Sequence, residues 1–455
     1  MPGPPGLPLE IWGRIAYFAD VKTLKKLRLT SRGSSMAATP RLFKEVTPSP
    51  FEQNCDKVDN ILANENLRRY VNKVTLDVHD WFPVSRDYNH TFVLPSIHKI
   101  PRVYLHCSEV FRGMNSEFPN VRNAVIRFSK GFQFGDNDED YGLQYYEIRS
   151  GVMKLFLSWL TSLPRLPVGL RLQNLHNVNS EDTETVLMLQ QLLGNLRSMR
   201  LGILHEDDNP DGELSLERYD QYHKFARELP SVWLEPVSSI LQHLSLYSSV
   251  YYGFYPRLDL TNVHLPNLKM LSLGNHIFVH DSQLNFILFH SSTLRELYID
   301  NCAILYAVGI YNKNMCYLAT PAGVMDVDPT ETYRVKHRAT YSQRWHDYFR
   351  AFNEGLPHLC YFRVGTNVTW WTELDGIPFG RESGIETQLS SKRYMEFDDD
   401  CLPPYVWYWN RYSPGPDDES PPRPNCDPED FMALRVLLRR IGQRAEGKGV
   451  FWDND

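Results

Sequence analysis

The residues of this 455-residue sequence that are best spaced for chemistry are the acids between Asp136 and Glu147. Carboxylates at positions 1, 3, 5 and 12 of this stretch, with a leucine at position 8, match a calcium-binding loop. Position 6 is Tyr141, however, where the sharp turn of such a loop needs glycine, and no amphipathic helix precedes the loop. An acidic, solvated loop is therefore the favoured interpretation, and we predict neither a metal nor another cofactor.

The sequence lacks the patterns that accompany catalysis. It contains no Gly-x-Ser-x-Gly, no His-Glu-x-x-His, no phosphate-binding loop and no Gly-x-Gly-x-x-Gly. The consecutive acids Asp398, Asp399 and Asp400 diverge in direction, which suits a solvated turn better than acid–base catalysis. The seven cysteines include no Cys-x-x-Cys pair for zinc, so reduced and mostly buried thiols are expected. We therefore predict a protein that is not an enzyme.

Composition and charge narrow the class of protein further. The chain has 42% hydrophobic residues, and 48 Lys and Arg stand against 55 Asp and Glu for a net charge of −7. This is the composition of a folded soluble protein, and the interspersed charges argue against binding to nucleic acid or to a membrane surface. The N-terminus has no signal-peptide pattern and no stretch reaches 18 consecutive apolar residues. We expect a cytoplasmic or nuclear location.

A row of short helices is predicted near the N-terminus. Apolar side chains recur at helical spacing after Pro8, and Asp20 can cap a second helix. Thr30 or Ser31 can cap a third, which must stop before Pro40, where a fourth turn starts. A module of about 40 residues cannot bury so many leucines by itself, so part of its surface should dock on something else.

Several spaced positions in this region form one pattern: Leu7-Pro8-x-Glu10-Ile11, Ile15, Leu24-x-x-Leu27-Arg28-Leu29-Thr30-Ser31-Arg32 and Thr39-Pro40-x-Leu42-Phe43. The pattern, which covers residues 6–46, resembles the F-box, especially its fungal version. In that family the box binds a Skp-type adaptor and attaches the protein to a cullin–RING ubiquitin ligase. The resemblance implies the following adaptor-facing and box-core residues: Leu7, Pro8, Ile11, Ile15, Leu24, Leu27, Leu29, Leu42 and Phe43.

Two positions depart from the F-box pattern. Ala19 stands where the family usually has leucine, and Ser34 stands where it usually has an aromatic anchor. Each change removes buried apolar area, which contributes roughly 25 cal/mol per Å². The departures predict a weaker affinity for the adaptor.

A repeated pattern occupies the middle of the chain. Leu241-x-x-Leu244-x-Leu246 recurs from Leu268 and again, ending in isoleucine, from Leu294, at spacings of 27 and 26 residues. This is the period of leucine-rich repeats, in which each unit supplies a short strand and a return segment. Cys302 and Asn367 take the ninth position of two copies, where a small donor can bond a loop carbonyl. Weaker copies are predicted at Val71/Val74/Leu76, Ile100/Val103/Leu105, Val121/Ala124/Ile126, Pro167/Leu170/Leu172, Leu196/Met199/Leu201 and Leu359/Phe362/Val364.

Helices and insertions are expected between the repeat strands. Helical periodicity marks residues 147–163, 180–193, 282–290 and 341–354 as return segments. Polar stretches at 205–220 and 306–340 are too long for simple turns and read as loops or local disorder. After Asn367 a Trp-, Tyr- and Pro-rich stretch is expected to cap the repeats. A last helix from Asp427, with Pro428 in its first turn, should pack back on them.

Together these patterns predict an α/β fold in three parts. A small helical F-box-like module spans 1–46, an irregular leucine-rich-repeat solenoid with loop insertions spans 47–367, and an aromatic, Pro-rich C-terminal cap with a terminal helix spans 368–455. Strand side chains beside the repeat leucines should line a concave face, where mixed aromatic and polar residues suit protein recognition. The predicted target-contacting residues are His243, Ser245, Tyr247, Met270, Ser272, Glu296, Tyr298 and Asp300.

Three hypotheses about function remain open from the sequence. The main one is a non-catalytic substrate receptor of a Skp–cullin–F-box ubiquitin ligase, which binds the adaptor through the box and a target protein through the repeats. The second is a leucine-rich-repeat scaffold outside any ligase, in which the N-terminal segment only caps the repeats. The third is an enzyme that uses calcium at Asp136–Glu147.

Overall fold

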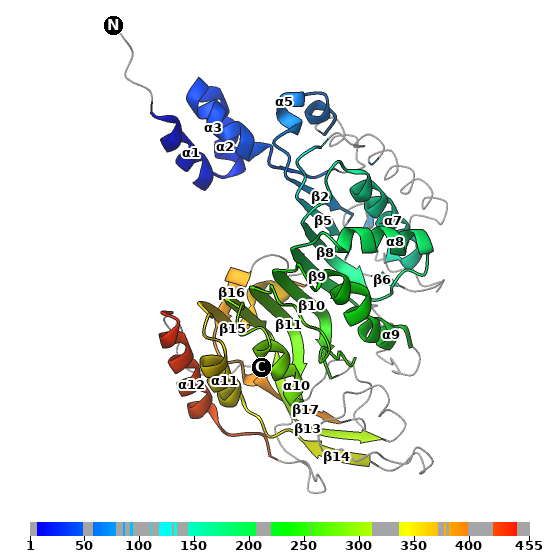
Figure 1. Cartoon of the computed structure of the whole chain (residues 1–455), viewed down its shortest axis with the longest axis vertical. Coiled ribbons are helices and arrows are strands. Elements are labelled where there is room, and N and C mark those ends of the chain that lie inside the picture. Colours follow the sequence, from blue (N-terminus) through cyan, green and yellow to red (C-terminus); the bar gives the residue numbers. More distant parts are fainter. Residues whose placement is uncertain are drawn as a thin grey trace. The chain divides into compact units, whose positions relative to one another are not determined.

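The fold is given by a computed structural model of the chain (Figure 1). It describes residues 7–48, 58–78, 85–86, 92–93, 111, 118–129, 132–133, 144–205, 220–254, 256–311, 336–371, 377–378, 382–398 and 422–443. The chain divides into two compact units, Met1–Ser129 with Asp136–Arg171 and Ser180–Asn195, and Lys130–Gly135 with Leu172–Asn179 and Leu196–Asp455. Both contain strands of a large, mostly parallel sheet, so the fold is α/β with helices at the N-terminus.

Three short helices begin the first unit: α1 (Leu9–Phe18), α2 (Val21–Thr30) and α3 (Arg32–Leu42). Two predicted caps separate them, since Asp20 accepts the backbone N–H of Thr23 at 2.6 Å and Ser31 accepts that of Ser34 at 3.2 Å. The predicted stop before Pro40 is wrong, because α3 continues through this proline. Proline has no N–H to donate to residue i−4, and α3 ends two residues after Pro40, at Leu42.

The first unit also contains parallel strands: β1 (Glu45–Val46), β2 (Lys73–Asp77), β5 (Asn123–Arg127) and the start of β8 (Gly169–His176). Val46 lies opposite Val74, and Val74 lies opposite Ala124, so apolar residues align across the strands. Helix α5 (Glu65–Arg68) precedes β2, and helices α7 (Tyr146–Ser162) and α8 (Thr183–Leu193) pack together. The short pieces are β3 (Ser85–Arg86), β4 (Phe92–Val93) and β7 (Gln144–Tyr145).

The second unit contains five further parallel strands of the sheet: β9 (Ser198–Leu204), β10 (His243–Tyr252), β11 (Met270–Phe278), β12 (Glu296–Asp300) and β15 (Tyr361–Asn367). Their register follows the predicted repeat, because Leu244 lies opposite Leu271 and Leu271 lies opposite Leu297. The weaker copies coincide with β2, β5, β8, β9 and β15, except the copy at Ile100/Val103/Leu105, which lies outside the described residues.

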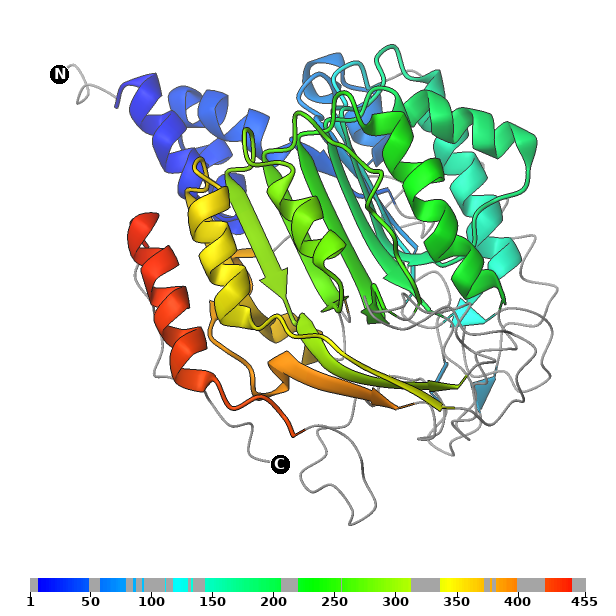
Figure 2. The same cartoon turned by 60° about the horizontal axis from the view of Figure 1, so that its bottom comes forward.

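Helices cover one face of these strands in the second unit: α10 (Asp281–Leu288), α11 (Trp345–Gly355) and α12 (Asp427–Arg440), with α9 (Asp220–Leu229) continuing into the turns Pro230–Leu234 and Glu235–Val237. Figure 2 shows α10 and α11 side by side along the strands and α12 against α11. Arg440 of α12 donates to the carbonyl of Leu356 at 3.1 Å, just past the end of α11. The last helix therefore packs on α11, and the expected return of this helix to the preceding part of the chain is confirmed.

Strands occupy the ends of a segment for which the sequence predicts a polar insertion. Strand β13 (Ala303–Tyr311) pairs in parallel with the end of β11 and with β17 (Tyr394–Asp398), and antiparallel with β14 (Lys336–Thr340). The prediction of loop or disorder over 306–340 is therefore wrong at both ends. Ala303–Tyr311 is an apolar run, and Ala303, Leu305 and Val308 bury against Phe254 and Ile277.

The edge of β15 is covered along its length. Strand β16 (Ile385–Thr387) pairs antiparallel with its carboxyl end. At its amino end the side chain of Gln443 accepts the N–H of Phe362 at 2.7 Å and donates to its carbonyl at 3.2 Å. The amide of Gln443 thus takes the place of another strand, which protects an otherwise unpaired edge.

Some predicted features lie outside the described residues. These are most of the acidic stretch 136–147, most of the insertion 205–220, the middle of 306–340 and the aromatic residues 405–409. Strand β6 (Phe132–Gln133) and the single turns Val368–Trp371, Glu382–Gly384 and Ser391–Arg393 complete the described elements. None of the helices described here is both long and apolar enough to cross a bilayer.

Candidate partner-binding surfaces

The three N-terminal helices share a very small core. It consists of Ala16 of α1, Leu24 of α2 and Ala38 of α3, which are nearly inaccessible to solvent. Leu27 and Leu42 pack against it while partly exposed. Because the residues at the centre are mostly alanines, little apolar area is removed from water inside the module.

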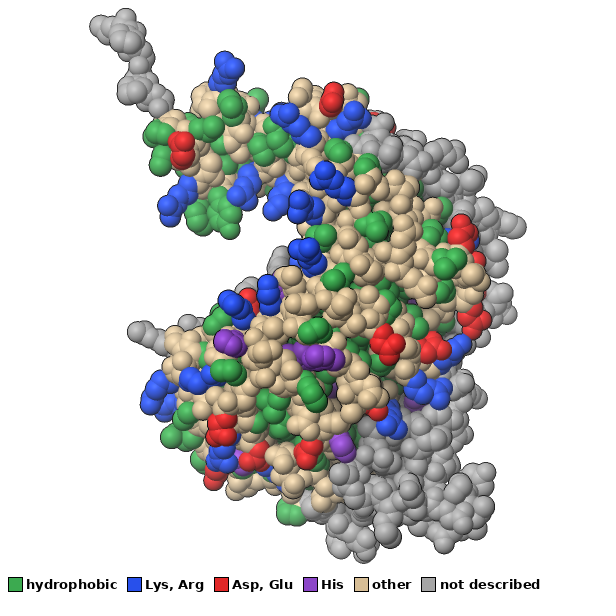
Figure 3. Space-filling model, viewed as in Figure 1, with side chains coloured by type: hydrophobic (Ala, Val, Ile, Leu, Met, Phe, Trp, Pro, Cys, Tyr) green, Lys and Arg blue, Asp and Glu red, His purple; other side chains and the backbone are tan. Residues whose placement is uncertain are grey.

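Most of the large apolar side chains in this module face solvent instead. Helix α1 contributes the majority, and Phe18 is 76% exposed. Leu29 of α2 is 89% exposed, which is unusual for a leucine inside a helix. Figure 3 shows hydrophobic side chains gathered on these helices. We call this the N-terminal apolar surface, and it consists of Leu7, Leu9, Ile11, Ile15, Tyr17, Phe18, Val21, Leu29 and Met36.

The F-box residues implied by the resemblance divide into two groups in the structure. Leu24 is buried, and Leu27, Leu42 and Phe43 are half-buried, which suits box-core positions. The exposed group consists of Leu7, Pro8, Ile11, Ile15 and Leu29. Other exposed apolar residues are not singled out by the sequence pattern, namely Leu9, Tyr17, Phe18, Val21 and Met36. The helical spacing in α1 is readable from the sequence, but which face remains uncovered depends on how α2 and α3 pack.

The two departures from the F-box pattern have local substitutes. Ser34 is buried and donates through Oγ to the carbonyl of Leu27 at 2.8 Å, so α2 and α3 are joined by a hydrogen bond there. Beside it, a Cβ on Gly33 would lie 3.3 Å from the ring of Trp12, so an aromatic ring from α1 packs at this point of α3. Ala19 packs partly buried against the small core.

The sheet of the second unit carries the predicted target-contacting residues in three rows. Register places His243, Met270 and Glu296 side by side at the amino ends of their strands. Ser245, Ser272 and Tyr298 form the next row, and Tyr247, Gly274 and Asp300 form the third. Burial increases along this series: the first row is half-exposed, whereas Ser272, Tyr247 and Asp300 are fully buried.

Described residues of the same chain, at 367–371, 377–378 and 382–384, cover the buried rows. Glu382 pairs with Arg200 of β9 and accepts the hydroxyl of Ser245 at 3.4 Å. The ring of Trp370 stacks on Tyr247 at 5.9 Å between centroids, and its Nε1 donates to Asp300 at 2.8 Å. The expectation of an open concave face is therefore corrected for Ser245, Tyr247, Ser272 and Asp300, because the chain itself covers them. It is corrected for Tyr298 as well, which is also buried.

The cover requires close packing at one glycine of the third row. The ring of Tyr247 lies directly over Gly274, where an added Cβ would be 2.2 Å from the tyrosine Cδ1. Tyr247 also shares a hydrogen bond with Ser272 at 2.9 Å, and the guanidinium of Arg200 lies 4.6 Å from its ring centre. Burial raises the pKa of Asp300 to about 6, against the lowering effect of its hydrogen bond to Trp370.

The half-exposed row leaves part of the sheet face accessible. His243, Met270 and Glu296 lie there, and burial lowers the pKa of His243. Glu296 accepts the hydroxyl of Tyr298 at 2.8 Å, and Tyr298 packs against Tyr361 of β15. Mixed aromatic, acidic and imidazole groups of this kind are typical of protein contacts.

One group of possible metal ligands exists among the described residues. Nitrogen, sulfur and oxygen atoms of His346, Cys426 and Asp430 lie within 4.8 Å of one another. The carboxylate of Asp430, however, already accepts bonds from His346 at 2.9 Å, Arg393 at 3.0 Å and Tyr394 at 2.8 Å. Because protein donors, one of them a buried guanidinium, already surround this carboxylate, the arrangement fits a structural link between α11 and α12 better than a metal site.

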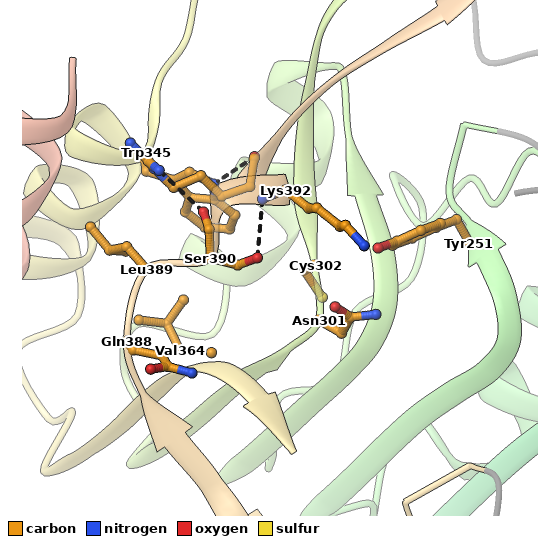
Figure 4. A pocket seen from close by; sticks show the side chains of 11 residues that line it. Tyr251, Asn301, Cys302, Trp345, Val364, Gln388, Leu389, Ser390 and Lys392 are labelled. Atoms are coloured by element: carbon orange, nitrogen blue, oxygen red, sulfur yellow. Dashed lines mark hydrogen bonds between the residues drawn. The ribbon is translucent and has the colours of Figure 1, made fainter. Parts of the chain in front are cut away.

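A small crevice lies beside this link and offers little room (Figure 4). Its cavity volume is about 10 Å³, and its lining includes Tyr251, Cys302, Trp345 and Lys392. A space of this size holds about one water molecule. Burial raises the pKa of the Cys302 thiol, which makes a reactive thiolate unfavourable there. Instead the thiol lies 3.4 Å from the carbonyls of Leu273 and Asp300, so its acceptors are strand carbonyls where a loop carbonyl is expected.

The N-terminal apolar surface and the half-exposed row of the sheet are thus the two surfaces best suited to binding, and both suit protein partners. Comparison with known proteins adds no relative to this picture: no protein-family model matches the chain, and no curated protein matches it either.

Proposed function

We propose that this protein is a non-catalytic receptor that docks on a Skp-type adaptor through its N-terminal helices. The adaptor would attach it to a cullin–RING ubiquitin ligase, and the sheet-bearing part of the chain would hold a target protein. No residue of the chain reacts in this mechanism. Two binding surfaces raise the effective concentration of a target lysine near the ligase-bound ubiquitin donor.

We further propose that the parallel strands form an irregular leucine-rich-repeat solenoid. Support comes from the alignment of Leu246, Leu273 and Ile299 across β10, β11 and β12, at the spacing of the repeat. Asn275 within β11 and Asn301 directly after β12 also adopt the left-handed conformation, and the side chain of Asn301 donates to that of Asn275 at 2.7 Å. Residues 26 positions apart thus share one backbone conformation at neighbouring strands, which is typical of a repeat protein.

The observation that carries the proposed function is the N-terminal apolar surface. Five large apolar side chains of α1 are exposed, namely Leu9, Ile11, Ile15, Tyr17 and Phe18, while only Ala16 of this helix is buried. A surface helix normally turns its apolar stripe toward its own core. Because α1 instead presents apolar side chains outward, a second protein is needed to remove them from water.

Co-expression with the Skp-type adaptor of the same organism tests the proposal. We expect a one-to-one complex on size-exclusion chromatography. The double variant Leu7→Asp and Ile11→Asp should abolish this complex, because each unpaired carboxylate would be buried at the interface. The two side chains are 50% and 45% exposed in the free chain, so the thermal midpoint of the variant should stay close to that of the unchanged protein.

A matched control uses exposed apolar residues elsewhere. Leu187 and Phe289 are 59% and 67% exposed, and their replacement with aspartate should leave the complex intact. A chain that runs as a folded monomer beside free adaptor contradicts the adaptor proposal. So does a complex that survives the change at Leu7 and Ile11.

A second candidate function is a scaffold in which the N-terminal helices only cap the sheet. It is favoured by the attachment of the helices to strand β1, where the carbonyl of Lys44 accepts the N–H groups of Asn72 and Lys73 at 2.8 and 3.0 Å. Deletion of residues 1–43 keeps these bonds and tests this candidate. A large fall in thermal midpoint indicates a cap, whereas an unchanged midpoint indicates an independent docking module.

A further inference from the structure

The charge of the N-terminal module differs from that of the rest of the chain. Residues 1–46 contain eight Lys and Arg against three Asp and Glu, a net charge of +5, although the whole chain carries −7. The remaining residues therefore carry −12. The near balance of the full sequence hides a basic module attached to an acidic body.

The acids of the module are mostly engaged in local structure. Asp20 caps α2 through Thr23, and this hydrogen bond lowers its carboxyl pKa. Glu45 lies 2.7 Å from the ammonium of Lys73 in the neighbouring strand. In contrast, Lys22, Lys25 and Lys26 of α2 are exposed and have no ion-pair partner within the described part of the chain.

The basic groups lie beside the N-terminal apolar surface. Lys25 and Lys26 precede Leu29 by four and three residues, so all three share one exposed side of α2. The guanidinium of Arg41 lies 4.3 Å from the ring centre of Tyr17, which belongs to the apolar surface. Figure 3 shows Lys and Arg side chains next to hydrophobic ones on these helices.

We propose that the adaptor surface bound by the N-terminal helices is acidic, and that carboxylates of the adaptor face Lys22, Lys25, Lys26 and Arg41. This inference rests on the proposed function. Carboxylates placed around an apolar contact accelerate association by long-range attraction and add little to the lifetime of the complex. The association rate should therefore depend on salt, and the dissociation rate should not.

The arrangement of the apolar residues favours a protein over an anionic membrane. A helix that lies in a membrane surface carries its apolar residues on one face and its lysines on the opposite face of the same helix. Here the apolar residues are spread over α1, α2 and α3, and the lysines are on α2 while α1 has Arg14 alone. A groove on another protein can cover such a compound surface, whereas a flat bilayer interface cannot.

Association kinetics with the adaptor test the inference on the full chain. The rate constants are measured at about 50 and about 300 mM salt, which changes the Debye length from about 14 to about 6 Å. We expect association of the unchanged protein to slow about tenfold over this range. The combined variant Lys22→Glu, Lys25→Glu and Lys26→Glu should associate at least about tenfold more slowly at low salt and lose the salt dependence.

The control variant makes the same change of charge elsewhere: Arg350→Glu, Arg435→Glu and Arg439→Glu on α11 and α12, all exposed in the structure. It should associate like the unchanged protein. A complex whose association is insensitive to salt overturns the acidic-surface inference and leaves the proposed function standing. Absence of any complex overturns both, as does binding to phosphatidylserine vesicles without binding to the adaptor.

Discussion

At the scale of single residues, the carboxylate of Asp430 joins several elements of the second unit. It has no solvent exposure, and its two carboxylate oxygens accept bonds from the backbone of His346 as well as from the side chains of Arg393 and Tyr394. Arg393 is itself only 3% exposed. A buried charge pair of this kind contributes little net stability while both members are present, but loss of one member leaves the other uncompensated.

Replacing Asp430 with alanine should therefore lower the free energy of unfolding by about 3–5 kcal/mol. Urea unfolding followed by circular dichroism measures the loss. The matched change Asp427→Ala removes a carboxylate that is 30% exposed and also pairs with Arg393, so it should cost clearly less. Equal losses for the two variants contradict the view that burial makes Asp430 the essential partner.

Helix caps illustrate which residue contacts can be predicted from the sequence. Asp20 caps the helix that the sequence assigns to it, and Ser31 is one of the two caps predicted for the next helix, because both side chains accept a hydrogen bond from the first turn. At α8 the cap is Asp182 although Ser180 lies just before it, and at α10 it is His280 although Asp281 follows it. Several polar residues in succession can fill a cap, and tertiary packing decides which one does.

At the scale of elements, the leucine spacing predicts the parallel strands well. Leucines at fixed intervals identify strands whose neighbours repeat them, so β9 to β12 and β15 can be located from the amino-acid sequence alone. The strands β13, β14 and β17 cannot, because they pair outside the repeat register and join segments about 30 to 90 residues apart in sequence. The cover at Glu382 and Trp370 escapes prediction for the same reason.

The pairing of Gln443 with the edge of β15 gives a prediction at this scale. Gln443→Ala removes the hydrogen-bond partners of both the N–H and the carbonyl of Phe362, which is fully buried. The change should lower the free energy of unfolding by about 1–3 kcal/mol. Gln443→Glu keeps an acceptor for the N–H but places a carboxylate oxygen against the carbonyl, so it should not restore full stability. Amide hydrogen exchange at Phe362 reports the loss locally. Unchanged protection in Gln443→Ala shows that the edge is held by other contacts.

At the scale of the whole molecule, the two surfaces proposed to bind partners are built differently. The N-terminal apolar surface is open and made of helices with a small core, so it gains stability when a partner covers it. The sheet is covered by its own chain over Tyr247 and Asp300, whereas the row at His243, Met270 and Glu296 is half-exposed. Under the proposed function, recognition of a target would be restricted to the amino ends of the strands, a limit that the leucine spacing alone does not indicate.

The pKa values of three buried histidines determine how the free energy of unfolding changes as the pH falls. Burial lowers the pKa of His205 and His276 to about 3 and that of His290 to about 4, compared with 6.5 when exposed. Their contribution to stability is present above pH 6.5 and is lost as the pH falls, because the unfolded chain binds these protons and the folded chain does not. Asp300 has a pKa of about 6, so the folded state binds its proton before the unfolded state does. This carboxyl therefore raises the free energy of unfolding as the pH falls below 6.

The three histidines bind protons on unfolding and the one carboxyl releases its proton, so unfolding takes up about two protons net. The free energy of unfolding should therefore fall by roughly 2.7 kcal/mol per pH unit between about pH 6 and pH 5. Urea midpoints at about pH 7.5 and about pH 5, at constant ionic strength, measure this slope. His276→Gln should start less stable at the higher pH, because the ring packs between Tyr252 and Phe278, and it should lose less on acidification. Equal midpoints for the unchanged protein at both pH values contradict the assignment, because neutral buried imidazoles require the slope.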